Sequence, residues 1–244
     1  NYIRFETQNV GVITIQKDDI LDVEAVNVAQ MKDNQLWFNN PQSTRYLWGP
    51  NGYGLKKGEG YYQNIWVLFN HFSVGVTDNF SVGGGVIPLF LFGGAASPVW
   101  VTPKFTIAVT ENKVNGGVGG FFGTVAGISE TGFGIAFGHL TFGPRDRNIT
   151  FGMGYGYTGG EWAQHPALSL AASIRTGPRG YIMSENYYIS SGDGGALMSF
   201  AGRRLFKKTS LDYGLILPLG TGGILIAVPW LGITIPFRKN ATIE

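Results

Sequence analysis

The sequence predicts an all-β protein, an antiparallel transmembrane β-barrel, and three observations point to this fold class. Strand-length segments alternate between large apolar and small polar residues. Charged residues make up only 14 % of the 244 residues, against roughly 25 % in a typical soluble domain. Finally, turn residues separate a long succession of such segments, which is the pattern of barrel strands.

The clearest segment covers residues 148–158. Its large side chains fall on one face of an extended chain, and Asn, Thr and Gly occupy the other face. A period of two over about ten residues lets a tilted strand cross the hydrocarbon layer of a bilayer. The side chains that we predict to face lipid are Ile149, Phe151, Met153, Tyr155 and Tyr157. The opposite face suits a crowded, wet lumen.

Composition excludes several other classes. The uncharged stretches 79–103 and 217–237 contain several Gly and Pro residues each, which would break a membrane-spanning helix. The absence of cysteine excludes disulfides, thiolate metal sites and cysteine nucleophiles. A net charge of +2 gives no case for nucleic acid as a partner. A soluble Gly-rich β-sandwich remains an alternative.

The balance of charge indicates a domain boundary. Residues 1–33 hold six acids and three bases, whereas the remainder holds ten acids and fifteen bases. We predict a small periplasmic β module over 1–33, which is the end of a larger one. A linker over 34–43 follows, then an outer-membrane barrel over 44–237 and a C-terminal tail over 238–244. Because the chain starts at Asn1, we expect a removed signal peptide or a longer precursor.

Twelve segments have strand character, and ten is the alternative count. They are 44–54, 61–77, 80–92, 99–111, 116–128, 132–142, 148–158, 165–175, 181–189, 196–206, 211–219 and 224–237. The predicted connections are short, and none is large enough to plug the barrel. Phe133, Ile135 and Phe137 are expected to face lipid. Segments 61–77, 116–128 and 181–189 are apolar on both faces, which bulges or contact with a second protein would explain.

Alternate turns of such a barrel share one end. The turns near 77–79, 111–115, 143–147, 176–180 and 207–210 would therefore form a basic periplasmic rim. Counting from the first predicted strand places Lys56 and Lys57 at the outer end. A basic turn residue is usually a solvated charge, so the rim alone predicts no ligand.

Three charged side chains inside strands are candidates for the lumen: Arg175, Arg203 and Asp212. Arg203 and Asp212 flank the turn at 207–210 and are predicted to be diagonal neighbours across two strands. We favour a salt bridge that stiffens the barrel over a constriction that selects solutes. The direction of Glu185 stays open, since it shares a face with Met183 and Tyr187.

Catalytic signals are weak. His71, His139 and His165 are the histidines, yet no G-x-S-x-G or other nucleophile motif accompanies them. His139 shares a face with Phe137, which suggests a ring anchored at the membrane interface. No H-x-x-x-H or D-x-D-x-D-G pattern predicts a metal site. We therefore predict no catalytic, cofactor-binding or metal-binding residues.

Several stretches resemble uncharacterised outer-membrane β-barrels of Bacteroidota that carry a small N-terminal β module. They are WFNNPQSTRY at 37–46, LKKGEGYYQN at 55–64, GVTDNFSVGGG at 75–85 and PWLGITIPF at 229–237, with GVITIQKDDI at 11–20 resembling the end of the module. The chain departs from the pattern because seven residues follow Phe237, where barrel insertion signals usually end. The resemblance implies a fold and a location, and it brings no catalytic residues.

The function predicted first is therefore a structural or accessory role, as a subunit of a larger complex in the bacterial outer membrane. Membrane lipid is the expected partner, together with other outer-membrane or lipoprotein subunits. A narrow passive pore for small solutes is the alternative. A lipid-modifying outer-membrane enzyme is the third reading, and the histidines are the only residues that favour it.

Overall fold

The computed structural model describes residues 2–7, 11–19, 31–32, 35–88, 90, 94, 96–128, 132–190, 194–220 and 226–238. Contacts divide the chain into two units, Asn1–Trp37 and Phe38–Glu244. The division falls shortly after residue 33, where the sequence predicts that the N-terminal module ends. Most of the predicted tail, residues 239–244, lies outside the described residues.

The first unit contains short elements. They are strands β1 (Tyr2–Thr7) and β2 (Gly11–Gln16), the 3-10 turn η1 (Lys17–Asp19), and strands β3 (Met31–Lys32) and β4 (Gln35–Leu36). Strands β1 and β2 pair antiparallel, as do β3 and β4.

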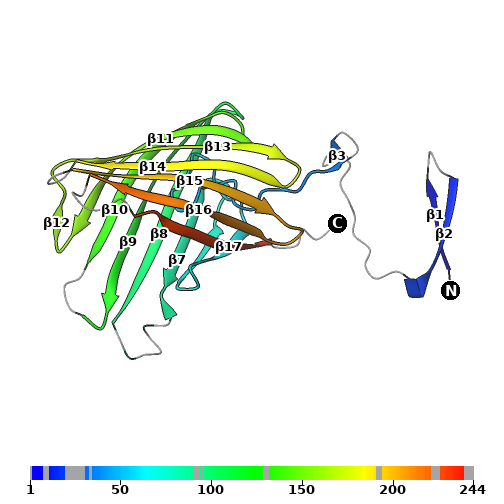
Figure 1. Ribbon diagram of the computed structural model, residues 1–244, viewed down its shortest axis with the longest axis horizontal. Coiled ribbons are helices and arrows are strands. Elements are labelled where there is room, and N and C mark those ends of the chain that lie inside the picture. Colours follow the sequence, from blue (N-terminus) through cyan, green and yellow to red (C-terminus); the bar gives the residue numbers. More distant parts are fainter. Residues whose placement is uncertain are drawn as a thin grey trace. The chain divides into compact units, whose positions relative to one another are not determined.

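The second unit is a closed antiparallel barrel of twelve strands (Figure 1). The strands are β5 (Glu59–Ile65), β6 (Phe69–Gly75), β7 (Phe80–Val86), β8 (Ser97–Thr110), β9 (Val114–Ala126), β10 (Phe133–Phe142), β11 (Arg147–Thr158), β13 (Ala167–Gly177), β14 (Gly180–Ile189), β15 (Gly195–Leu205), β16 (Ser210–Leu219) and β17 (Val228–Arg238). The two-residue β12 (Glu161–Trp162) folds back on the end of β11. Pairing of β17 with β5 closes the ring. The predicted all-β barrel of twelve strands is confirmed.

The count of twelve is right although two of the predicted strands are wrong. Residues 44–54 form no strand of the barrel and lie buried inside it. Residues 61–77 form two strands, β5 and β6, joined by a turn in which the Leu68 amide donates to the Ile65 carbonyl at 3.0 Å. The predicted strand at 44–54 is therefore absent and the predicted strand at 61–77 is replaced by two, so the total stays at twelve.

That turn carries no sequence signal, because its residues are apolar. Trp66 and Val67 have φ angles of +51° and +64°, in the left-handed region that normally favours Gly or Asn. Contacts far along the chain hold the turn: the Trp66 indole donates to the Pro229 carbonyl at 2.7 Å, and its ring lies 5.1 Å from that of Trp230. Tertiary packing therefore overrides the local preference.

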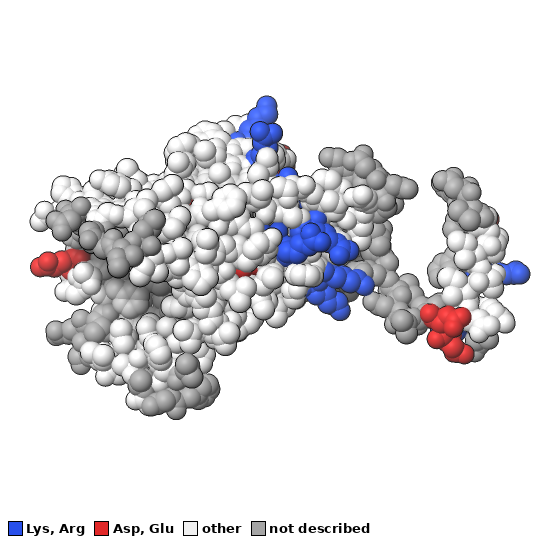
Figure 2. All heavy atoms as spheres, viewed as in Figure 1, with Lys and Arg blue, Asp and Glu red and all other residues white. Residues whose placement is uncertain are grey.

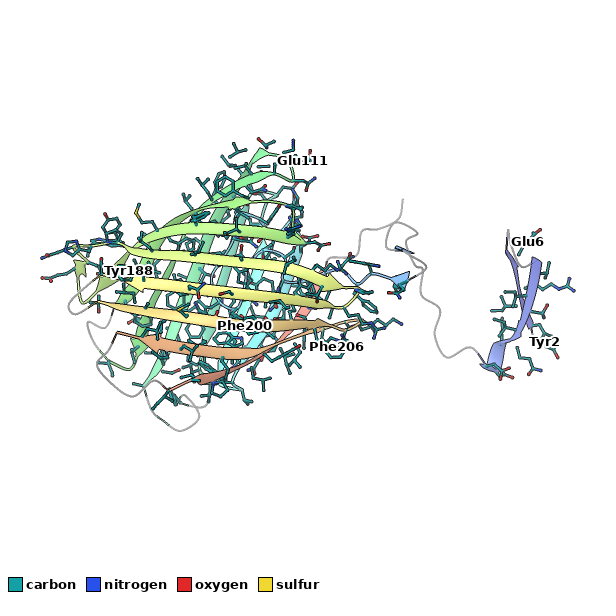
Figure 3. The ribbon with its side chains drawn as sticks, turned by 45° about the horizontal axis from the view of Figure 1, so that its top comes forward. Tyr2, Glu6, Glu111, Tyr188, Phe200 and Phe206 are labelled. Carbon is teal, nitrogen blue, oxygen red and sulfur yellow. The ribbon has the colours of Figure 1, made fainter. Side chains whose placement is uncertain are left out.

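The outer wall is apolar across the strands. On β11 the side chains of Ile149, Phe151, Met153 and Tyr155 are exposed, while Tyr157 is half-buried with its ring 5.3 Å from Trp162. Figure 3 shows Tyr188 on β14 and Phe200 on β15 among the side chains that cover the strands, and both are exposed. A continuous exposed apolar wall around a closed barrel matches the lipid-facing band of an outer-membrane protein. No helix among the described residues is long and apolar enough to cross a bilayer.

The orientation predicted for β10 is wrong. Phe133, Ile135 and Phe137 share the face of His139 and Thr141, which are buried in the barrel, whereas Leu140 and Phe142 on the opposite face are exposed. His139 is thus a lumen residue and not an interfacial anchor; its ring stacks on Phe137 at 5.6 Å. The inward rings have apolar partners inside the barrel, which a pattern of residues cannot reveal.

One end of the barrel is basic, and we call it the turn end. It contains the β6–β7, β8–β9, β10–β11, β13–β14 and β15–β16 turns, and there the chain also enters β5 and leaves β17. Figure 2 shows Lys and Arg gathered at this end and an acidic group at the opposite one. Lys56 and Lys57 were predicted at the outer end but lie at the turn end, where the Lys57 amide donates to Asp78 at 3.0 Å. The false first strand caused this error.

A charge on the outer wall tests the membrane assignment. We expect Met153→Arg, midway along β11, to lower the free energy of unfolding in lipid by about 2–4 kcal/mol, because arginine at mid-depth meets hydrocarbon. Tyr157→Arg, on the same face near the strand end, should cost about 0–1 kcal/mol. Urea unfolding in lipid vesicles measures both values, and equal losses would contradict a lipid-facing wall.

Candidate functional site

The barrel lumen contains part of the protein's own chain, residues 38–58, which we call the lumen segment. It starts at the turn end, where the Phe38 amide donates to the Pro178 carbonyl at 3.1 Å. Inside the barrel it doubles back, with the Tyr46 amide donating to Gly49 and a bridge between Arg45 and Pro50. It then returns to the turn end to begin β5. The lumen is thus filled by a segment that precedes the first strand. The sequence predicts only that no connection between strands is large enough to plug the barrel.

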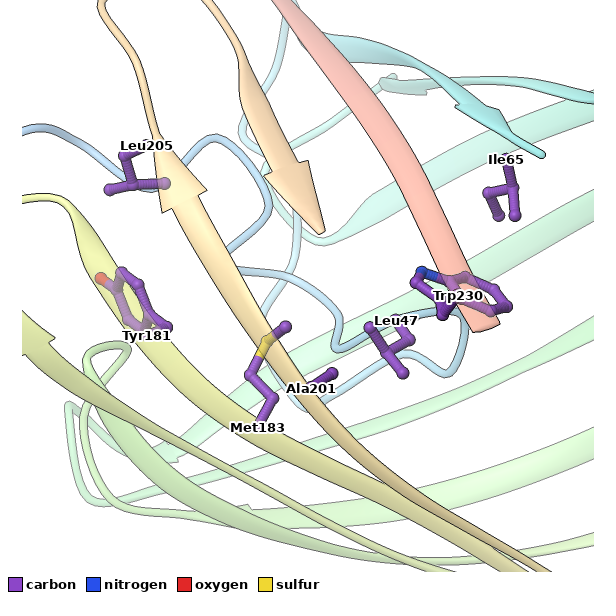
Figure 4. Close-up of a cluster of buried hydrophobic side chains, with 7 residues drawn as sticks. All are labelled: Leu47, Ile65, Tyr181, Met183, Ala201, Leu205 and Trp230. Carbon is purple, nitrogen blue, oxygen red and sulfur yellow. The ribbon is translucent and has the colours of Figure 1, made fainter. Parts of the chain in front are cut away.

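The tip of the lumen segment sits in an apolar cluster within the barrel. Leu47 belongs to a cluster of buried hydrophobic side chains whose other members come from four strands, as Figure 4 shows: Ile65, Tyr181, Met183, Ala201, Leu205 and Trp230. The Trp48 ring lies 6.2, 6.3 and 6.0 Å from those of Phe69, Trp100 and Phe121. Apolar residues on both faces of β14 are therefore explained by this segment, and a second protein is not needed to explain them.

Arg203 and Asp212 form a buried ion pair in the lumen, near the β15–β16 turn. Both are buried, with 2 % and 1 % exposure. They are directly paired across β15 and β16, not diagonal as predicted. Arg203 Nε and Nη2 donate to the two carboxylate oxygens of Asp212 at 2.6 and 3.0 Å. This bidentate geometry is the strong form of a carboxylate–guanidinium contact.

The remaining donors of Arg203 hold the lumen segment. Its Nη1 donates to the Gln42 carbonyl at 3.0 Å and to Asn40 Oδ1 at 3.3 Å, and its Nη2 donates to the Tyr46 carbonyl at 2.6 Å. All five N–H groups of the guanidinium are then used. The pair consequently joins two strands of the wall to the segment inside it.

Glu185 holds the tip of the segment from β14, the strand next to β15. Its carboxylate accepts the backbone amides of Leu47, Trp48 and Gly49 at 2.7, 3.1 and 2.9 Å, and the Tyr187 hydroxyl at 2.6 Å. The side chain faces inward without a bulge, because Glu185 pairs in register with Ala171 of β13 and the register against β15 is the same on both sides of it. Four donors thus converge on one carboxylate, and they tie the tip of the segment to β14.

Removing the charge of Glu185 should loosen the tip. In Glu185→Gln the amide cannot accept from all three backbone N–H groups as a carboxylate does, so we expect unfolding to become easier by about 1.5–3 kcal/mol. Thermal unfolding in detergent measures the change. Glu161→Gln, in the exposed β12, is the matched control and should change stability by less than about 0.5 kcal/mol. Similar shifts for both variants would refute the role of Glu185.

Small polar residues of the inner wall bind the middle of the segment. The Tyr46 hydroxyl lies 2.7 Å from Asn148 Oδ1 and 2.6 Å from Thr150 Oγ1. The Gly52 amide donates to Thr141 Oγ1 at 2.6 Å. A Cβ added at Gly52 would lie 2.4 Å from the Asn115 carbonyl oxygen, so only glycine allows this approach. The polar face of β11 thus contacts the lumen segment, whereas the sequence predicts that this face meets a wet lumen.

Two cations of the site come from the segment and from β8. Arg45 donates through Nη1 to Gln63 and stacks over the Tyr61 ring at 4.2 Å. Lys104 Nζ donates to the carbonyls of Thr44 and Tyr53 at 3.1 and 2.7 Å. Sequence reasoning missed Arg45, because it assigned residues 44–54 to a strand.

Two arginines lie at the turn end of the lumen. Arg145 Nη1 donates to Ser43 Oγ at 2.7 Å, and its guanidinium lies 4.5 Å from the Tyr53 ring. Burial lowers the pKa of Arg145 below its ordinary value, and the nearby Tyr53 and Glu59 oppose that change. Arg175, predicted for the lumen, lies at this rim and pairs with Asp146 at 3.2 Å while donating to the Phe38 carbonyl at 2.7 Å.

A cavity of about 280 Å³ remains between the lumen segment and the inner wall. Its lining extends from Tyr61 and Ser81, near the turn end, to Ile135 and Ala167, near the other end. Arg45, Lys104, Glu185 and Tyr187 line it, as do two histidines. The residues that line the cavity therefore span most of the length of the barrel.

The histidines of the lumen do not form a catalytic arrangement with the described residues. His71 Nδ1 accepts the Trp100 indole N–H at 3.1 Å, and His139 stacks on Phe137. Neither ring has a serine hydroxyl or a carboxylate among the contacts of the described residues, and His165 is exposed. Within the same residues, no group of three or more His, Asp or Glu could hold a metal ion.

Comparison with known proteins identifies the fold. No protein-family model and no curated protein match the chain. Among solved structures it is similar to a "KdgM porin", with a TM-score of 0.56 and 8 % identity over 74 % of this chain and 99 % of that one. At this identity the likeness concerns the fold. The chain therefore has the fold of a porin-like outer-membrane β-barrel, and its own residues 38–58 occupy the lumen.

Proposed function

We propose that the protein is a narrow passive pore for small solutes in the bacterial outer membrane. The observation that supports this function is the cavity that follows the inner wall beside the lumen segment. Its lining includes aromatic rings, hydroxyl groups and charged groups, which a small hydrated solute can contact in passing. The width left by the segment would set the upper size of the solute.

An accessory role is the weaker proposal. It depended on strands that are apolar on both faces, and Leu47 and its neighbours in the lumen now account for the inward apolar residues of β14. A role in lipid modification has no nucleophile in contact with His71 or His139 among the described residues.

Planar-bilayer recording of the purified, full-length protein tests the pore. We expect small, discrete conductance steps, because the lumen segment leaves a cavity of only about 280 Å³. Protein denatured by heating before addition serves as the control for membrane damage. Complete lack of steps at protein amounts that insert into vesicles would overturn the proposed function.

We infer that the turn end faces the periplasm. Short turns lie on that side in bacterial barrels, and longer loops lie outside. Lys113→Cys, in the β8–β9 turn, should therefore be labelled by a membrane-impermeant maleimide only after the outer membrane is permeabilised. Glu161→Cys, at the opposite end, should be labelled on intact cells, and the chain has no native cysteine to interfere. The reverse labelling pattern would invert the orientation.

A further inference from the structure

The cations along the cavity differ from the other charges of the lumen in their partners. Arg203 is paired with Asp212, and Glu185 is surrounded by three amides and a hydroxyl. Lys104 and Arg45, in contrast, contact only carbonyls, an amide oxygen, a hydroxyl and a ring among the described residues. Neither makes an ion pair within that part of the chain.

Lys104 stands in a positive environment. It lies close enough to Arg145 and Arg45 to be repelled by both, and its hydrogen-bond partners among the described residues include no carboxylate. Its ammonium has three donors, of which two are used by the Thr44 and Tyr53 carbonyls. The side chain is half-buried and lines the cavity. An ammonium with a spare donor and cationic neighbours is stabilised by an anion beside it.

The wider charge distribution favours approach from the turn end. Among the described residues after residue 37, every Lys and Arg lies at or near the turn end, in the lumen segment or on an inward strand position. The loops at the other end, over 87–96, 127–132, 159–166, 190–194 and 220–227, contain no Lys or Arg and three acids. Charges inside a lumen with low-dielectric walls concentrate ions of opposite sign.

We propose that the cavity beside the lumen segment binds and conducts small anions in preference to cations, and that Lys104 is the principal contact. The hydroxyl groups of Ser73, Ser81 and Thr102 line the same cavity and supply further donors. Conduction of the anion rests on the pore function proposed above, whereas binding does not. Rings of lysine or arginine are the usual means by which pores select anions.

Zero-current potentials across a KCl gradient measure the selectivity. We expect the wild-type protein to pass chloride in preference to potassium. Lys104→Gln should lower the chloride-to-potassium permeability ratio by roughly twofold or more, because it removes one lumen cation. Lys104→Arg keeps the charge and should keep the ratio. Lys113→Gln removes an exposed cation outside the cavity lining and is the matched control.

A binding measurement keeps the inference testable if the protein does not conduct. Trp48 lines the cavity, so the difference in emission between wild type and Trp48→Phe reports on it. Iodide should quench this Trp48 emission more strongly than caesium, and Lys104→Gln should reduce the iodide effect. Stronger quenching of Trp48 emission by iodide, in a protein that shows no conductance, would refute the pore but support the anion site. Equal or stronger quenching by caesium would overturn the anion site, and so would a permeability ratio that Lys104→Gln leaves unchanged. In either case, any conductance that is recorded would still support the pore.

Discussion

Deletion of residues 40–56 is expected to raise the single-channel conductance several-fold. These residues fill the lumen, and both ends of the lumen segment lie at the turn end, so the shortened chain still reaches β5. A twelve-stranded barrel whose interior is no longer filled leaves a wider water path. Planar-bilayer recording compares the deletion with the intact protein, and migration of unheated samples in gels shows whether the barrel is folded.

Deletion of residues 2–19 is the control for shortening the chain. It removes β1, β2 and η1, which belong to the other unit, and should leave conductance unchanged. If the two deletions gave the same conductance, the lumen segment would not restrict the pore.

Arg203→Met is expected to be the most destabilising single substitution, at about 3–5 kcal/mol. It leaves the Asp212 carboxylate buried without its cation and takes three hydrogen bonds from the lumen segment. Urea unfolding of the protein in detergent gives the free energy. The released segment should also become sensitive to added protease from the turn end.

Arg204→Met is the matched control, because this neighbouring arginine is exposed. Its effect should stay within about 0.5 kcal/mol. The double variant Arg203→Met/Asp212→Leu should recover part of the loss, since no unpaired charge remains in the wall. The importance of the pair would be disproved if Arg203→Met proved as mild as Arg204→Met, or if the double variant recovered nothing.

Some inner-wall interactions were accessible to sequence reasoning. Arg203 and Asp212 were identified as lumen neighbours because a lipid-facing charge is costly and both flank one short turn. Sequence reasoning predicts a diagonal arrangement and not the direct pairing, because the register of β15 and β16 depends on the length of the turn at Phe206–Thr209. The partners of Glu185 were inaccessible, since three backbone amides leave no trace in a pattern of side chains.

The sequence by itself determined the class of the protein. Alternation with period two, scarcity of charge and an even series of strands follow from each strand meeting lipid on one side and the lumen on the other. These constraints act residue by residue, so they are readable along strands such as β8, β11 and β13.

Only the tertiary structure decided how the lumen is filled. The sequence predicts a strand over residues 44–54, but the barrel closes through β17 and β5 without them, and their partners are Arg203, Glu185 and the hydroxyls of the inner wall. The same filling turned Phe133, Ile135 and Phe137 inward. The physical reason is that an inward face may be polar or apolar according to what occupies the interior, and its occupant lies far away in sequence.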